Sequence, residues 1–137
     1  MKKYLNASIV YAVLALAGGV FFREFTKFFS FDGVTALGFI HPHYLLLGTC
    51  FFLGLVVFDK LFNISERLGK ILIAYQVGLN ASVVMMIVRG ILQVMGTPLS
   101  AGLDASISGI AGLGHIVLGV SLVAVLVKIR SVALASK

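Results

Sequence analysis

Charged residues are scarce in this sequence. Only 12% of its 137 residues are Asp, Glu, Lys or Arg, and 60% are hydrophobic. The mean hydropathy is +1.09. Because soluble domains carry about 25% charged residues, this composition excludes an ordinary soluble domain. It predicts an integral membrane protein with the lipid bilayer as its main partner.

Cysteine is nearly absent as well. The single cysteine, Cys50, lies inside an apolar run, so a disulfide and a CxxC metal site within the chain are both excluded. The sequence also shows no activated nucleophile, no carboxylate pair and no phosphate-binding loop. No stand-alone catalytic activity is therefore predicted.

Long apolar runs fill most of the chain. They cover residues 5–22, 36–58, 71–95 and 105–127. About 20 apolar residues are needed to cross roughly 30 Å of hydrocarbon as a helix, so each run can span a membrane once. The sequence predicts one domain over residues 1–137, an all-α, four-helix transmembrane bundle.

The basic residues predict the orientation of the bundle. Eight of them fall on one side of the predicted spans: Lys2, Lys3, Lys60, Arg67, Lys70, Lys128, Arg130 and Lys137. Three fall on the other: Arg23, Lys27 and Arg89. The positive-inside rule places the first group, and both termini, in the cytoplasm. Because the net charge of +6 lies between apolar runs rather than in a surface stripe, nucleic acid is not a predicted partner.

All three histidines fall inside predicted spans, where ionisable groups are costly and usually functional. His41 and His43 lie in the second span and His115 in the fourth, all in the outer half of the membrane. The two spans run in the same direction, so an imidazole from each can meet. His41 and His43 are about 200° apart on a helix and share one metal only if Pro42 distorts the backbone. Either one is a candidate partner for His115.

The surroundings of His115 favour a flat macrocycle. Small residues share its helical face: Ser108, Ala111, Gly112 and Gly119. They let a porphyrin approach the helix closely, and Arg23 and Arg89 lie just above, where a guanidinium can bind haem propionates. We therefore expect a b-type haem, with iron held by His115 and by His41 or His43, and a role in electron transfer or in haem or redox sensing. Copper is the alternative metal.

Other functions are compatible with the same residues. Histidine can form hydrogen bonds between helices, arginine can extend to the membrane surface, and glycine-rich faces often serve helix packing alone. The alternative hypothesis is a cofactor-free module that self-associates or docks to a larger membrane complex. A small carrier or channel is a further alternative.

Polar residues in the third span predict hydrogen bonds between helices. Gln76, Asn80 and Gln93 can each contribute about 0.6 to 2 kcal/mol. Asn80 lies near mid-membrane and most needs a partner. Tyr11 and Tyr75 can serve as that partner or line a pocket, and their spacing does not separate these alternatives.

Three segments resemble a known family. They are Gly18-Gly19-Val20-Phe21-Phe22-Arg23-Glu24-Phe25-Thr26-Lys27, then His41-Pro42-His43, then the run from Gly102 through Gly112 to His115. Together they resemble a family of small four-helix bacterial membrane proteins of unknown function, found mostly in Gram-positive bacteria. The resemblance covers nearly the whole chain. It implies the four-span topology and a multi-pass location in the bacterial cytoplasmic membrane, but no activity.

A more distant similarity is to helices one and two of the catalytic subunits of haem-copper oxidases and nitric oxide reductases. In that family an arginine after the first helix precedes a histidine that is an axial ligand of low-spin haem. His41 is the position that matches best. With four spans and one histidine outside the His41/His43 pair, this chain cannot also build the copper site, so oxygen reduction by this chain alone is not expected.

Overall fold

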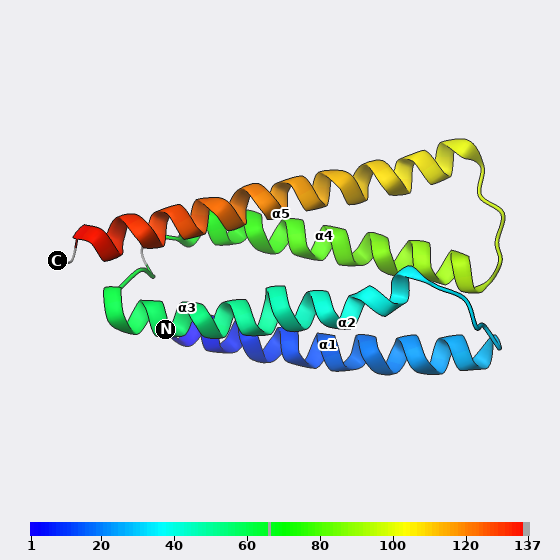
Figure 1. Ribbon diagram of the computed structural model, residues 1–137, viewed down its shortest axis with the longest axis horizontal. Helices are drawn as coiled ribbons and strands as arrows, with labels where there is room; N and C mark the ends of the chain where they lie inside the picture. The colour runs from blue at the N-terminus through cyan, green and yellow to red at the C-terminus, as the bar shows by residue number, and fades with distance from the viewer. Residues whose placement is uncertain (66, 136–137) are drawn as a thin grey trace.

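The chain folds as four long helices (Figure 1). The computed structural model describes residues 1–65 and 67–135, and within these it is all-helical. The four helices are α1 (Lys2–Phe28), a second span (Ala36–Phe62), α4 (Gly69–Val94) and α5 (Ala101–Ala135). All four are long and apolar enough to cross a membrane. The predicted four-helix transmembrane bundle is confirmed.

The second span is built of four consecutive segments. They are η1 (Ala36–Phe39), α2 (Ile40–Pro42), the π-helix η2 (His43–Cys50) and α3 (Phe51–Phe62). A π-helix is rare and often marks a functional site, because its wider turns redirect the side chains. In η2 the N–H of Phe51 donates to the carbonyl of Leu46, five residues earlier.

The wider turns preserve one buried face along the second span. Ile40, Tyr44, Gly48 and Phe52 are buried at intervals of four residues. An α-helix advances by 3.6 residues per turn, so this stripe would drift around a regular helix. Because η2 has longer turns, the stripe stays directed at the neighbouring helices.

The start of α1 and the end of α5 lie at the same end of the molecule, together with the end of α3 and the start of α4 (Figure 1). The connections 29–35 and 95–100 lie at the opposite end. This agrees with the predicted even number of crossings, while the cytoplasmic assignment stays a prediction. The helices are longer than the predicted spans, since regular structure continues through polar flanks such as Lys128 and Arg130. Lys137, one of the eight basic residues counted above, lies outside the described residues.

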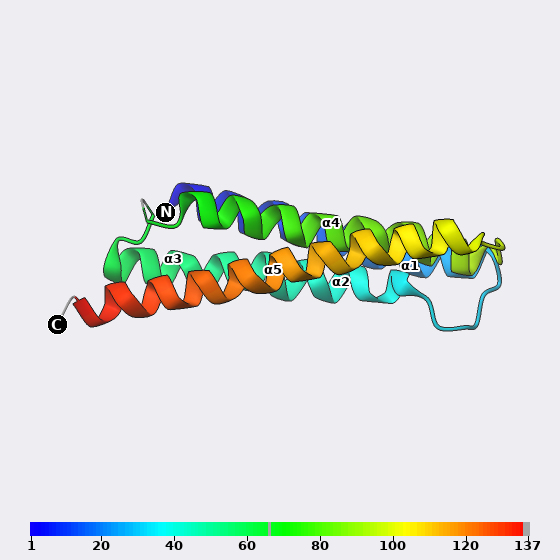
Figure 2. The ribbon, with the colours of Figure 1, turned by 90° about the horizontal axis from the view of Figure 1, so that it is seen from above.

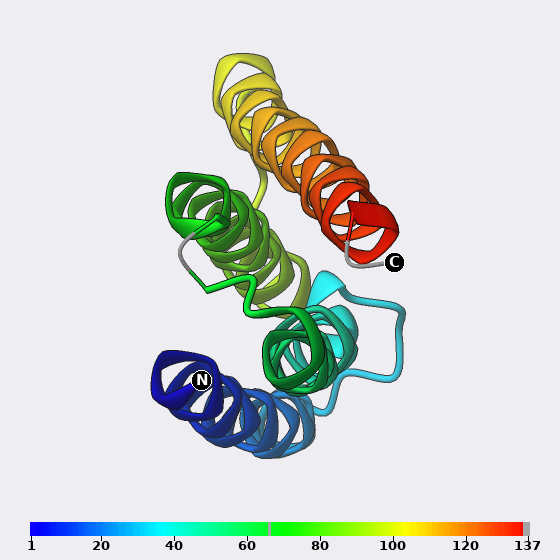
Figure 3. The same cartoon turned by 90° about the vertical axis from the view of Figure 1, so that its left-hand side faces the viewer.

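The helices form an open, staggered row rather than a closed square. In the end view the order is α1, the second span, α4 and α5, with α1 and α5 at opposite ends (Figure 3). Seen from above, α5 runs obliquely across the other helices (Figure 2). The most apolar stretch of α4 is 33% buried, against 17% for α1 and for the second span. Much of the apolar surface therefore faces outward, as expected where lipid is the solvent.

Glycines set the closest helix contacts. A Cβ at Gly78 of α4 would lie 2.5 Å from the backbone nitrogen of Leu118 in α5. A Cβ at Gly48 would lie 2.5 Å from Cβ of Tyr11 in α1. The small-residue face expected to pack in the fourth span is only partly used. Gly114 packs against Ser82, whereas nothing lies within 4 Å of an added Cβ at the remaining glycines of α5: Gly102, Gly109, Gly112 and Gly119.

Asn80 forms a hydrogen-bond network inside the bundle. Its amide nitrogen donates to the hydroxyl of Tyr11 at 2.9 Å, and the hydroxyl of Tyr44 donates to its side-chain oxygen at 3.1 Å. This network joins α1, the second span and α4. Of the two candidate partners, Tyr11 forms the bond to Asn80, whereas Tyr75 donates to the carbonyl of Leu47 in η2 at 2.7 Å.

The side chains of Gln93 and Gln76, also in α4, differ in whether their hydrogen bonds reach another helix. The side-chain oxygen of Gln93 accepts from the backbone N–H of Ala36 at 2.8 Å, which is the predicted bond between helices. Gln76 donates to Leu72 within its own helix at 3.4 Å. Gln93 therefore helps to dock η1 on α4, close to the histidines of the second span.

Candidate functional site

Two histidines from distant parts of the chain lie side by side in the half of the bundle nearer the connections 29–35 and 95–100. The ring centroids of His43 and His115 are 6.1 Å apart, and the ring planes are inclined at 87°. His43 is the first residue of η2 and His115 lies in α5. One imidazole from the second span and one from the fourth therefore meet, as their parallel direction allowed.

Both rings are oriented by their own helices. Nδ1 of His43 lies 2.8 Å from the carbonyl oxygen of Phe39, and Nδ1 of His115 lies 2.8 Å from that of Ala111. A carbonyl oxygen can only accept, so Nδ1 carries the proton in each ring. In the neutral form each Nε2 then presents a lone pair. This is the arrangement in which metal-ligating histidines are usually held.

His41 is directed to a different neighbour. Its Nδ1 lies 2.8 Å from the carbonyl oxygen of Ala15 in α1. His41 and Arg23 line one hollow between α1 and the second span, of about 280 Å³. The structure thus separates the predicted site residues: His43 lies beside His115, while His41 and Arg23 lie together elsewhere.

Open space adjoins the histidine pair. His43 lines a hollow of about 270 Å³ together with Phe39, Pro42, Leu46 and Leu47. His115 is exposed at the side of α5. One turn away, Gly112 has nothing within 4 Å of the place where a Cβ would be. Open space therefore lies beside each of the two rings.

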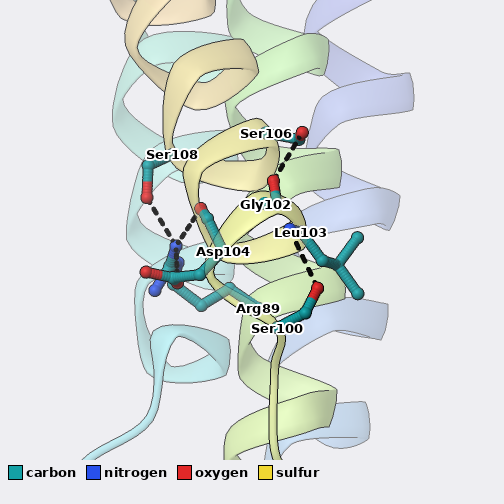
Figure 4. A network of polar contacts seen from close by, with 7 residues as sticks. All are labelled: Arg89, Ser100, Gly102, Leu103, Asp104, Ser106 and Ser108. Atoms are coloured by element: carbon teal, nitrogen blue, oxygen red, sulfur yellow. Dashed lines mark hydrogen bonds and ion pairs between the residues drawn. The ribbon is translucent and has the colours of Figure 1, made fainter.

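Arg89 of α4 lies against the first turns of α5 (Figure 4). Its Nη2 donates to the carboxylate of Asp104 at 2.9 Å and to the hydroxyl of Ser108 at 2.7 Å. It thereby ties α4 to α5. Ser108 and His115 are seven residues apart, which is two helical turns and about 10 Å along the same face. The sequence placed Arg89 and Asp104 at the outer edge but did not predict their ion pair.

A model of a protein family described as a protein of unknown function, DUF2871, matches residues 1–132. The chain belongs to this family. No curated protein and no solved structure matches the chain. The family supports the resemblance found in the sequence and carries no assigned activity.

The His43/His115 pair of this DUF2871 member consists of two side chains. Among residues 1–65 and 67–135, no group of three or more His, Cys, Asp or Glu side chains gathers as a metal site would require. Haem needs only axial ligands from the protein, because the macrocycle supplies the equatorial nitrogens. Two imidazoles are therefore sufficient for haem.

Proposed function

We propose that the protein binds one b-type haem between η2 and α5, with His43 and His115 as the two axial ligands. Its role would be electron transfer, or haem or redox sensing, in the bacterial cytoplasmic membrane. The observation that carries this proposal is the 6.1 Å separation of the two rings.

That separation matches the spacing that one metal imposes on two axial imidazoles. A nitrogen ligand lies about 2 Å from its metal, so two imidazoles on opposite sides of one ion have ring centres roughly 6 Å apart. The centroid distance of 6.1 Å therefore supports ligation of one iron by both rings. Their Nδ1 protons are already bound to carbonyls, which directs Nε2 to the metal.

The residues around His43 and His115 also fit a haem. Gly112 leaves space beside His115, and the hollow at His43 is lined mainly by apolar side chains. Arg89 lies about two turns outward, where its guanidinium would bind a propionate in addition to Asp104. Arg23 lines the hollow of His41 instead, so Arg89 is the propionate partner that we propose.

Ligation by two imidazoles limits the chemistry. Haem supplies a one-electron couple at the iron, and with both axial positions taken it offers no open position to oxygen. The residues of the chain would hold the iron, orient the rings and surround the macrocycle with apolar side chains. Electron exchange or sensing follows from this arrangement better than catalysis on a bound substrate.

The test is a visible absorbance spectrum of the detergent-purified protein from haem-supplemented cells, oxidised and then reduced with dithionite, with iron and copper quantified. We expect sharp reduced α and β bands and one iron per chain. His43→Ala and His115→Ala should each lose the six-coordinate spectrum. His41→Ala is the matched control within the same span and should keep it.

Three outcomes would overturn the proposal or its ligand assignment. A colourless, metal-free protein would favour the cofactor-free interaction module. Copper without iron would favour the alternative metal. A spectrum that survives His43→Ala but is lost in His41→Ala would exchange the two ligands.

A further inference from the structure

The hollow between α1 and the second span is not used by the proposed haem site. It has a volume of about 280 Å³, just below the 300–1,000 Å³ typical of pockets that hold drug-sized ligands. Its lining consists of Leu16, Gly19, Val20, Arg23 and His41. Two polar side chains therefore lie in an otherwise apolar groove.

Close packing at Gly19 positions His41 in this groove. A Cβ at Gly19 would lie 3.3 Å from Nδ1 of His41, so the glycine lets the imidazole lie flat against α1. Nδ1 donates to the carbonyl of Ala15 at 2.8 Å. In the neutral ring Nε2 is then a hydrogen-bond acceptor, and it calls for a ligand that carries a donor.

Arg23 supplies the complementary group. Its guanidinium has donors and no acceptor, so it calls for an oxygen atom on the ligand. Its positive charge also disfavours a metal cation at His41. The carboxylate of Glu24 lies 3.6 Å from Nε of Arg23, which partly neutralises the guanidinium and favours a neutral oxygen over an anionic phosphate.

The depth of the groove also disfavours the anionic phosphate of a lipid headgroup. Ala15, which accepts from His41, lies thirteen residues before the outer end of α1 at Phe28, or about 20 Å along the helix axis. Arg23 lies about 8 Å from that end by the same measure. The ligand must therefore place one polar atom within the hydrocarbon region and another nearer the surface. A lipid headgroup stays at the surface.

We propose that this groove binds the head group of a membrane hydroquinone. One hydroxyl donates to Nε2 of His41, the oxygen across the ring accepts from Arg23, and the flat apolar ring lies against Leu16 and Val20. The proposal concerns binding and stands whether or not haem binds at His43 and His115.

The experiment measures binding of tetramethylhydroquinone, kept reduced under anaerobic conditions, to the full chain in phosphatidylcholine nanodiscs. Equilibrium dialysis against empty nanodiscs corrects for partition into lipid. We expect saturable binding at one molecule per chain. The oxidised quinone should bind about tenfold more weakly, because it cannot donate to Nε2 and one hydrogen bond of about 1.4 kcal/mol is a factor of ten.

Two kinds of variant distinguish a loss of binding contacts from a general effect on the fold. His41→Ala and Arg23→Gln remove one hydrogen bond each and should weaken binding about tenfold. Leu16→Trp should abolish binding by filling the groove. Leu16 is 62% exposed and Val13, on the same helix but outside the lining, is 60% exposed. Val13→Trp is therefore a matched control for bulk and should leave binding unchanged.

The haem proposal and this one fail in different ways. His115→Ala should lose haem and keep hydroquinone binding. Hydroquinone binding that is unchanged by both His41→Ala and Leu16→Trp would overturn the inference. A different result would overturn it as well: anionic phosphatidylglycerol binds saturably, this binding is lost in Arg23→Gln, and tetramethylhydroquinone does not bind. The groove would then be a site for a lipid headgroup.

Discussion

Gly78 of α4 lies directly against the backbone of α5 at Leu118, where an added Cβ would approach the nitrogen to 2.5 Å and the carbonyl oxygen of Gly114 to 2.9 Å. Backbone atoms cannot rotate away as a flexible side chain can. We therefore expect Gly78→Ala to destabilise the protein by about 1–3 kcal/mol, the range for overpacking a tight contact. The measurement is unfolding in mixed detergent and SDS micelles.

Gly54 in α3 gives the control for this substitution. An added Cβ there meets nothing within 4 Å, so Gly54→Ala should be neutral or stabilising by up to about 1 kcal/mol through helix propensity. Equal effects of the two substitutions would contradict the close approach of α4 and α5. If haem binds, Gly78→Ala should also perturb its spectrum, since the same shift of α5 moves His115 away from His43.

Asn80 connects three helices through Tyr11 and Tyr44. We expect Asn80→Leu to cost about 1–2 kcal/mol, because hydrogen bonds between membrane helices average about 0.6 kcal/mol each and two hydroxyls are left without this partner. Gln76→Leu is the control, since the bond of Gln76 to Leu72 lies within its own helix. In a double-mutant cycle, Tyr44→Phe and Asn80→Leu should couple by about 0.6 kcal/mol. Zero coupling would contradict the Tyr44 bond.

The sequence predicted the helices well because apolar length alone determines a membrane span. It predicted that Asn80 needs a partner because Asn80 lies near mid-membrane, but it did not separate Tyr11 from Tyr75. Tyr44 was missed, since it sits in an apolar run and nothing in its spacing indicates a polar contact. The bond of Tyr75 to Leu47 was missed because it depends on the π-helical backbone of η2.

The choice between His41 and His43 could not be made from the sequence for a related reason. Their separation around the helix was predictable, but which of them faces α5 depends on the turn of η2 and on the order of helices in the open row. Both are long-range properties. The same holds for Arg23 and Arg89, which the sequence placed at one membrane edge and the fold assigns to different hollows and helix pairs.

The ion pair of Arg89 and Asp104 should contribute little to stability. Its side chains are 31% and 52% exposed, and exposed pairs are worth about 0.2–1 kcal/mol and weaken with salt. We expect Asp104→Asn to cost less than about 1 kcal/mol at low salt and almost nothing at 1 M salt, measured by unfolding in micelles. Glu24→Gln, in the looser pair at 3.6 Å, is the control. A loss of several kcal/mol that salt does not reduce would show that the pair is buried in the membrane.

The orientation of the bundle can be tested with single cysteines in a Cys50→Ala background. Arg67 lies in the connection between α3 and α4, at the end that holds both termini, and Thr97 lies in the connection between α4 and α5 at the other end. Both residues are exposed. Because the basic residues are concentrated at the end with the termini, the positive-inside rule places Arg67 in the cytoplasm and Thr97 outside. In intact cells a membrane-impermeant maleimide should label Thr97→Cys at once and Arg67→Cys only after the cells are permeabilised. The reverse pattern would invert the topology and turn the His43/His115 pair and the groove of His41 toward the cytoplasmic half of the membrane.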